Sequence, residues 1–139
     1  MSVGVTCDES KNALLAALVA SGPWTDAYMM LSEADITPDR ETVLADLDVD
    51  EVTVSGYARQ PITGLGTPAI VTPGVSRVIA DPCTFINTSG GDSGTIYTWG
   101  IVDDTTGHLI EAGRWDTPFV LEATIGEFVT TPTVRLSGE

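Results

Sequence analysis

Apolar residues in the first third of the chain recur mostly at helical spacing. An apolar stripe at this spacing is typical of an amphipathic helix. Asp8 or Ser10 can cap the start of this helix, and Ser21-Gly22-Pro23 ends it, because glycine tolerates the left-handed conformation and proline cannot continue a helix. The stripe consists of Leu14, Leu15, Leu18 and Val19.

A strand and a second, shorter helix are predicted next. Ala27–Leu31 favours a strand. Thr37 is a good helix N-cap, Pro38 suits the first helical position, and acidic residues occupy the first turn. Because this run barely exceeds two turns, the helix depends on docking rather than on its own propensity. Its acidic residues are Asp39 and Glu41, and its apolar side is formed by Val43, Leu44 and Leu47.

From Glu51 onward, apolar residues recur at every second position instead of at helical spacing. Val52 and Val54 alternate with polar neighbours, and the predicted strand continues through Gly56-Tyr57-Ala58-Arg59-Gln60. Turn signals then separate many short segments rich in Val, Ile and Thr, a pattern typical of a β-sandwich or flattened barrel. The further predicted strands are 69–71, 75–80, 84–86, 95–102, 109–115, 119–122, 128–130 and 133–136, and the predicted turns are 72–74, 81–82, 89–92, 103–107 and 115–118.

The clearest hairpin runs from Ile96 to Trp115 around the turn at 103–107. Because side chains alternate along a strand, Tyr97, Trp99 and Ile101 are expected on one face of its first strand. On the return strand, we expect one face to carry Leu109, Glu111, Gly113 and Trp115. Trp99 and Trp115 are therefore expected to meet across the core, although the sequence leaves the register open.

The 139 residues are predicted to form a single, mainly β domain with one N-terminal helix and one short second helix. Residues 1–8 are a candidate arm, residues 9–50 a helix-strand-helix segment, and residues 51–139 the β-sandwich body. The longest apolar run, Ala13–Ala20, is far short of the ~20 residues that a membrane-spanning helix needs.

Charge narrows the possible partners. Six Lys and Arg against twenty Asp and Glu give a net charge of −14. This balance argues against nucleic acid, whose phosphates need a basic face, and against anionic membrane surfaces. Cys7 and Cys83 lie far apart without metal-binding spacing, so we expect two reduced thiols, with a disulfide as the alternative.

Two segments resemble known functional motifs but lack residues that those motifs require. Gly91-Asp92-Ser93-Gly94 is similar to the nucleophile segment of trypsin-like proteases, but the chain's one histidine, His108, follows it instead of preceding it. We therefore expect an exposed glycine turn there and a hairpin-edge histidine. Asp46, Asp48 and Asp50 resemble the start of a calcium loop, whose sixth and twelfth positions here hold Glu51 and Tyr57 instead of Gly and Glu. A solvated helix end is expected, with an irregular calcium site as the alternative.

The remaining candidates are aromatic and basic side chains. Three Trp and three Tyr on a β-sandwich could form a platform for sugars, although core packing explains them more simply. Arg59 and Arg114 are expected to be neutralised by neighbouring acids. No catalytic residues, cofactor or metal ion are predicted.

Several segments, in their order, resemble small virion structural proteins of tailed bacteriophages. The resemblance covers about residues 27–136, and it differs at 110–114, where such proteins carry a more apolar strand. Its motif residues are Thr37, Pro38, Gly56, Tyr57, Arg59 and Gln60. The segments are Leu31-Ser32-Glu33-Ala34-Asp35-Ile36-Thr37-Pro38, Thr42-Val43-Leu44-Ala45-Asp46-Leu47, Gly56-Tyr57-Ala58-Arg59-Gln60, Trp99-Gly100-Ile101-Val102-Asp103, Gly107-His108-Leu109-Ile110 and Thr131-Pro132-Thr133-Val134-Arg135-Leu136.

The resemblance implies a non-enzymatic particle component made in the host cytoplasm. Within that class we favour a capsid decoration (cement) protein on the outer surface of the head, in contact with the major capsid protein lattice or other virion subunits and oligomeric, with a trimer favoured. The alternatives are a tail fibre or baseplate domain and a carbohydrate-binding β-sandwich module.

Overall fold

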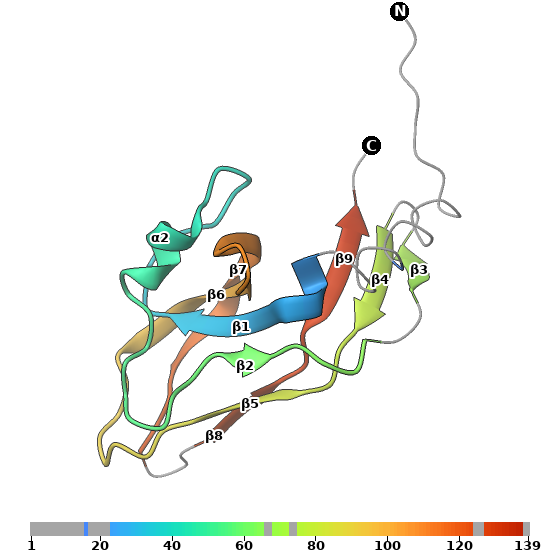
Figure 1. The fold of residues 1–139 in the computed structure, drawn as a ribbon. Coiled ribbons are helices and arrows are strands. Elements are labelled where there is room, and N and C mark those ends of the chain that lie inside the picture. Colours follow the sequence, from blue (N-terminus) through green and yellow to red (C-terminus); the bar gives the residue numbers. More distant parts are fainter. Residues whose placement is uncertain (1–15, 17–22, 66–67, 73–74, 124–126, 138–139) are drawn as a thin grey trace, which may run out of the picture.

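The computed structural model describes residue 16 and residues 23–65, 68–72, 75–123 and 127–137 (Figure 1). The predicted helix that follows Asp8 and the candidate arm at 1–8 lie outside these residues, apart from residue 16. Within the described part, the chain is mainly β. The elements are η1 (Pro23–Asp26), β1 (Ala27–Ser32), α2 (Leu44–Asp48), β2 (Gln60–Pro61), β3 (Ala69–Thr72), β4 (Val75–Ile79), β5 (Cys83–Ile86), β6 (Thr95–Asp103), β7 (His108–Val120), β8 (Glu127–Thr130) and β9 (Thr133–Ser137).

A four-stranded antiparallel sheet has the order β2-β1-β6-β7. β1 confirms the strand predicted at 27–31. Both of its faces are covered, because the successive residues Met29, Met30 and Leu31 are all buried. A strand covered on both sides needs apolar residues at consecutive positions, which explains why this segment does not alternate.

The two smaller sheets, β3-β4-β9 and β5-β8, are joined by chain continuity into one bent ribbon (Figure 1). β4 leads into β5, and antiparallel to them β8 leads into β9. Three residues separate β4 from β5, whereas two separate β8 from β9, so the register shifts by one at the bend. Pro82 and Pro132 cannot donate to the ladder there, and the Ala80 N–H bridges the bend by donating to the Pro132 carbonyl at 3.0 Å. We call this element the β4–β5/β8–β9 ribbon.

The main core lies between the four-stranded sheet and the ribbon. Phe85 is fully buried at its centre, together with Leu31, Ile101 and Leu121. A second, smaller cluster covers the opposite face of the sheet, where α2 contributes the buried Leu47. The sheet therefore has apolar contacts on both faces.

The predicted start of the second helix is wrong. The helix begins at Leu44, and Thr37 and Pro38 lie in the preceding loop. Asp39 accepts from the Glu41 N–H at 2.8 Å through its side chain and from the Thr42 N–H at 3.1 Å through its carbonyl. Such local bonds compete with helix formation. Asp46 then accepts from the Val43 N–H at 2.9 Å, satisfying one of the free donors at the helix start.

The strand predicted at 52–60 is largely an extended loop, and β2 retains only Gln60–Pro61. The alternation of burial is correct, because Val52 is buried whereas Thr53 is exposed. Gly56, however, has a φ of +89°, in the left-handed region that favours glycine, and a turn forms around it. This turn stops the ladder.

The β6–β7 hairpin is confirmed, with Gly107 at a φ of +73° in its turn. Irregular pairing changes which residues share a face. An extra residue, Ile110, lies between the pairs Ile101–Glu111 and Val102–Leu109. Leu109 therefore joins the small cluster, contrary to the prediction that it shares a face with Trp115.

The predicted turn at 115–118 is a second irregularity within β7, and the strand continues through it as far as Val120. Four residues of β7 lie opposite the single residue Tyr97, between the pairs Ile96–Phe119 and Thr98–Arg114. As a result Ile96, instead of Tyr97, joins Trp99 in the main core. The turn signal marked a real break in pairing, but the chain does not reverse there.

Candidate functional site

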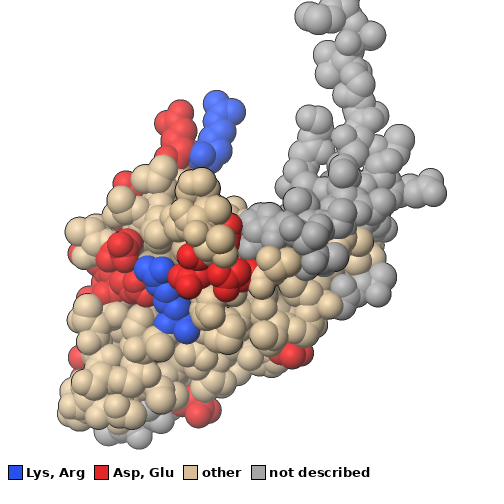
Figure 2. Space-filling view, viewed as in Figure 1, with Lys and Arg blue, Asp and Glu red and all other residues tan. Residues whose placement is uncertain are grey.

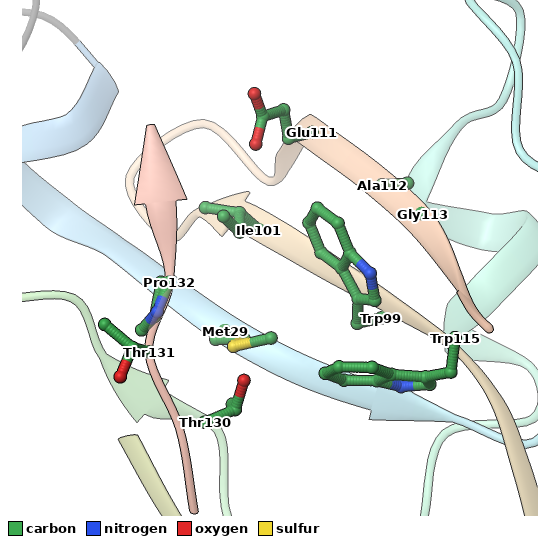
Figure 3. Close-up of a pocket in the computed structure, with 10 residues that line it drawn as sticks. All are labelled: Met29, Trp99, Ile101, Glu111, Ala112, Gly113, Trp115, Thr130, Thr131 and Pro132. Carbon is green, nitrogen blue, oxygen red and sulfur yellow. The ribbon is translucent and has the colours of Figure 1, made fainter. Parts of the chain in front are cut away.

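A cavity of about 520 Å³ lies between the four-stranded sheet and the bend of the ribbon (Figure 3). β6 and β7 form one side, the β8–β9 connection forms the other, and β1 contributes Met29. The cavity lies where the ribbon changes register, so the strands do not close over the sheet at this point. Its lining residues are Met29, Trp99, Ile101, Glu111, Ala112, Gly113, Trp115, Thr130, Thr131 and Pro132.

Trp99 and Trp115 dominate the cavity wall (Figure 3). Their ring centres are 6.4 Å apart and the planes are tilted by 56°, so the prediction that the two indoles meet is confirmed. Trp99 lies against Gly113, where an added Cβ would be 2.5 Å from its ring. The absence of a side chain at Gly113 is therefore what allows Trp99 to lie against β7.

Trp115 is held by one aromatic ring of its own strand, β7, and by one of the ribbon strand β8. Its ring makes edge contacts with Phe119 and Phe128, at centre distances of 5.6 and 5.5 Å. Its indole N–H is buried and, within the described part of the chain, has no acceptor. A buried unpaired donor costs about 1–3 kcal/mol, and such groups are rare in folded proteins.

Polar groups in the cavity come from both sides. Glu111 extends from β7, and Thr130 and Thr131 lie across the cavity in the β8–β9 connection (Figure 3). The site thus combines two large aromatic surfaces with a carboxylate and two hydroxyls. Such a combination is typical of sites for small polar molecules.

A half-buried polar network lies elsewhere, around Glu51. The Tyr57 hydroxyl donates to Glu51 at 2.7 Å and accepts from the Leu31 N–H at 3.0 Å. Arg59 donates to Glu51 through Nε at 3.0 Å and Nη2 at 2.7 Å, and also contacts Asp48 at 3.1 Å. These bonds join the loop at 51–59 to the central strand β1.

The network shifts the pKa of each main member. Burial raises the pKa of Glu51, but the hydrogen bonds from Arg59 and Tyr57 more than offset it, and its pKa lies below the ordinary value of 4.5. The hydrogen bond to Glu51 raises the pKa of Arg59, against its partial burial. Burial, together with the bond to the negative Glu51, raises the pKa of Tyr57. At neutral pH, Glu51 is therefore negatively charged, Arg59 is positively charged and the Tyr57 phenol is neutral.

The motif residues of the phage resemblance are only partly brought together. Tyr57 and Arg59 share the Glu51 network, and Gln60 of β2 pairs with Met29 of β1. Gly56 lies against Thr88, which an added Cβ would approach to 2.7 Å. Thr37 and Pro38, by contrast, lie in the loop before α2, so the six residues do not form one site.

Ser93 and His108 do not meet. Ser93 lies just before β6, whose first residue pairs with Val120, and His108 pairs with Asp103 at the other end of the hairpin. At ~3.3 Å per residue these ends are roughly 26 Å apart. Gly91 is exposed as predicted, but Ser93 is buried. The Ser93 hydroxyl donates to the Gly94 carbonyl at 2.8 Å and accepts from the Leu121 N–H at 2.9 Å, so it has a structural role.

Three of the four acidic side chains in the run at 46–51 contact other protein groups. Asp46 holds the start of α2, and Asp48 and Glu51 contact Arg59. In the residues described, no cluster of three or more His, Cys, Asp or Glu side chains has an arrangement that could bind a metal ion.

The expected neutralisation of both arginines is confirmed. Arg114 contacts Asp35 at 2.7 Å, donates to the Ile36 carbonyl at 3.0 Å, and lies 5.1 Å from the centre of the Tyr97 ring. Cys83 is buried, and burial raises the pKa of its thiol. Cys7 lies outside the described residues.

Sequence reasoning identified the two indoles of the cavity but not its other side. In the sequence, Thr130–Pro132 is marked only by the end of a predicted strand and by a proline. These residues line the cavity because of a long-range strand pairing, which the sequence does not show. A proline between two short strands, opposite another Asp-Pro break at 81–82, was the available hint.

None of the helices within the described residues has the length and apolar character required to cross a bilayer. Comparison with protein families, curated proteins and solved structures finds no match for the chain. The resemblance to phage virion proteins therefore stays a prediction.

Proposed function

We propose that this chain is a structural virion protein of a tailed bacteriophage, which binds the outer surface of the capsid and stabilises the shell. In this proposal the four-stranded sheet and the ribbon are the two layers of a β-sandwich. The order of the resembling segments and the β-rich architecture support the assignment. A cement protein that binds the assembled lattice better than free subunits stabilises the lattice by mass action.

The observation that carries the proposal is an apolar strip on the outer face of the ribbon. Inward residues of β5, such as Phe85, are buried, whereas Ile86 is 40% exposed and points to the other side. Val129 on β8 is 51% exposed, and Ile79 at the end of β4 is 50% exposed. We call Ile79, Ile86 and Val129 the outer strip.

These three residues are a majority of the large exposed apolar side chains in the described part of the chain; Val43 and Val49 are the other two. Exposed apolar residues that share one face of the ribbon offer an apolar surface to a partner. Arg77 lies two residues before Ile79 on β4 and therefore on the same face of that strand, so a cationic residue adjoins this strip in a strongly acidic chain. We infer that the outer strip contacts an apolar and acidic area of the capsid lattice.

The charge of the rest of the surface favours an outward position. Acidic atoms outnumber basic ones on the face in Figure 2, and they surround one basic group there. A net charge of −14 would repel packaged DNA. An oligomer, with a trimer favoured, would multiply weak individual contacts through effective concentration.

Val129→Glu is expected to weaken binding to expanded, undecorated capsids of the phage that encodes the chain by about tenfold or more, equivalent to ~1.4 kcal/mol. The reason is that a charge replaces an apolar contact at the centre of the strip. Co-sedimentation with capsids at increasing protein concentration measures this change. Val49→Glu is the matched control, because Val49 is 78% exposed and lies on the other side of the sheet, after α2.

Saturable binding at a fixed ratio per capsomer, lost in Val129→Glu and kept in Val49→Glu, would support the proposal. Equal loss in both variants would contradict the outer strip as the docking face. No binding of the wild-type chain to capsids would contradict the cement assignment and favour the tail fibre or baseplate alternative.

A further inference from the structure

We propose that the cavity beside Trp99 and Trp115 is a binding site for a neutral pyranose sugar. This site is independent of the proposed capsid contact, because it opens between the sheet and the bend of the ribbon instead of on the outer strip.

The size of the cavity and its place in the fold agree with a small-molecule site. A volume of about 520 Å³ lies within the range of ~300–1,000 Å³ typical of small-molecule sites. The cavity is also built into regular structure, since β1, β6 and β7 provide most of its lining residues.

The aromatic side of the cavity fits a sugar ring. The flat C–H face of a pyranose packs on an aromatic ring, and indole offers the largest such surface. One face of Trp99 is occupied by the backbone of Gly113, and the ring lines the cavity beside Met29 and Ile101 (Figure 3). Trp115 is fixed by Phe119 and Phe128, so the two indoles form a rigid, tilted corner.

The polar side of the cavity fits sugar hydroxyls. Thr130 and Thr131 lie across the cavity from Trp99 and can donate or accept. Hydrogen bonds from one side and ring contacts from the other would orient a single sugar unit.

The negative charge of the chain disfavours anionic ligands. The lining residues include one carboxylate and no Lys or Arg, within the part of the chain that the structure describes. The chain as a whole carries a charge of −14. Phosphorylated, sulfated or uronic sugars are therefore disfavoured, and neutral hexoses or N-acetylhexosamines are the expected class.

The test is a titration of the full-length ¹⁵N-labelled protein with cellotetraose, maltotetraose, mannotetraose and chitotetraose, followed through the indole N–H resonances of Trp99 and Trp115. At least one sugar is expected to shift both resonances saturably. Thr131→Val, which removes a hydroxyl at nearly constant shape, is expected to weaken that binding by about two- to tenfold. Thr84→Val, on the exposed face of β5, is the matched control and is expected to leave it unchanged.

Three results would overturn the proposal. One is that none of the four sugars shifts either resonance at millimolar concentration. Another is that Thr131→Val and Thr84→Val have the same affinity as the wild type. The third is saturable binding of choline, used as a separate probe, without binding of any sugar, because two indoles and a carboxylate would then form a site for organic cations.

Discussion

Replacing Phe85 by alanine is expected to lower the free energy of unfolding by about 3–5 kcal/mol. Phe85 is completely buried and stacks on Tyr57, with ring centres 5.9 Å apart and planes 13° apart. It also pairs in register with Phe128, so one side chain joins the ribbon, the loop at 51–59 and the sheet. Its removal leaves a cavity at the place where these three parts meet.

Urea unfolding followed by circular dichroism measures this loss. Thr84→Ala is the matched control, because Thr84 is the preceding residue on β5 and points outward. Its effect should stay within ~0.5 kcal/mol. A loss below ~1 kcal/mol for Phe85→Ala would show that the ribbon is not anchored to the sheet through this side chain.

The elements that sequence reasoning predicted best are those whose pattern follows from burial alone. β1 is apolar at consecutive positions because both of its faces are covered, and the β6–β7 hairpin combines alternating strands with a Gly107 turn. In both cases local residues and the final environment agree, which makes such segments predictable.

The prediction failed where local polar bonds or irregular pairing decide the structure. The local hydrogen bonds of Asp39 hold the loop before α2 in a non-helical conformation. Gly56 forms a turn inside a segment whose apolar and polar residues alternate as in a strand. The two irregularities in β7 depend on its pairing with β6, which sequence periodicity does not fix. The sequence therefore left open which residues of β6 and β7 lie opposite each other.

One side of the candidate site could also be predicted from the sequence, and the other could not. Trp99 and Trp115 could be paired from their positions on two predicted neighbouring strands. The position of Thr130 and Thr131 opposite them depends on a ribbon whose halves are about 50 residues apart in sequence. Long-range pairing of this kind leaves little trace in a single sequence.

Glu51→Gln is expected to lower the free energy of unfolding at pH 7 by about 2 kcal/mol, because it replaces charge-assisted hydrogen bonds with neutral ones. Glu51 accepts from both Tyr57 and Arg59 in a half-buried position. Urea unfolding at pH 7 and pH 3 measures the effect. The exposed Glu41→Gln is the matched control, with an expected change within ~0.5 kcal/mol at both pH values.

The pH dependence has a definite sign. The pKa of Glu51 in the folded protein lies below its ordinary value of 4.5. A carboxylate with a lowered pKa contributes stability that is fully present above the unfolded-state value and is lost as the pH falls through the folded-state value. The difference between wild type and Glu51→Gln should therefore shrink at pH 3. An equal difference at both pH values would mean that shape, instead of charge, accounts for the effect.

Arg59→Met separates the charge of the network from its packing. It keeps an apolar stem but leaves the Glu51 carboxylate half-buried without its bidentate partner, so at pH 7 it should be at least as destabilising as Glu51→Gln, by ~2–3 kcal/mol. At pH 3 the partly neutralised Glu51 needs that partner less, and the loss should decrease. If Arg59→Met were equally destabilising at both pH values, the arginine would stabilise the loop at 51–59 through its stem alone. A decrease for both variants would instead identify the ion pair as the link between this loop and β1.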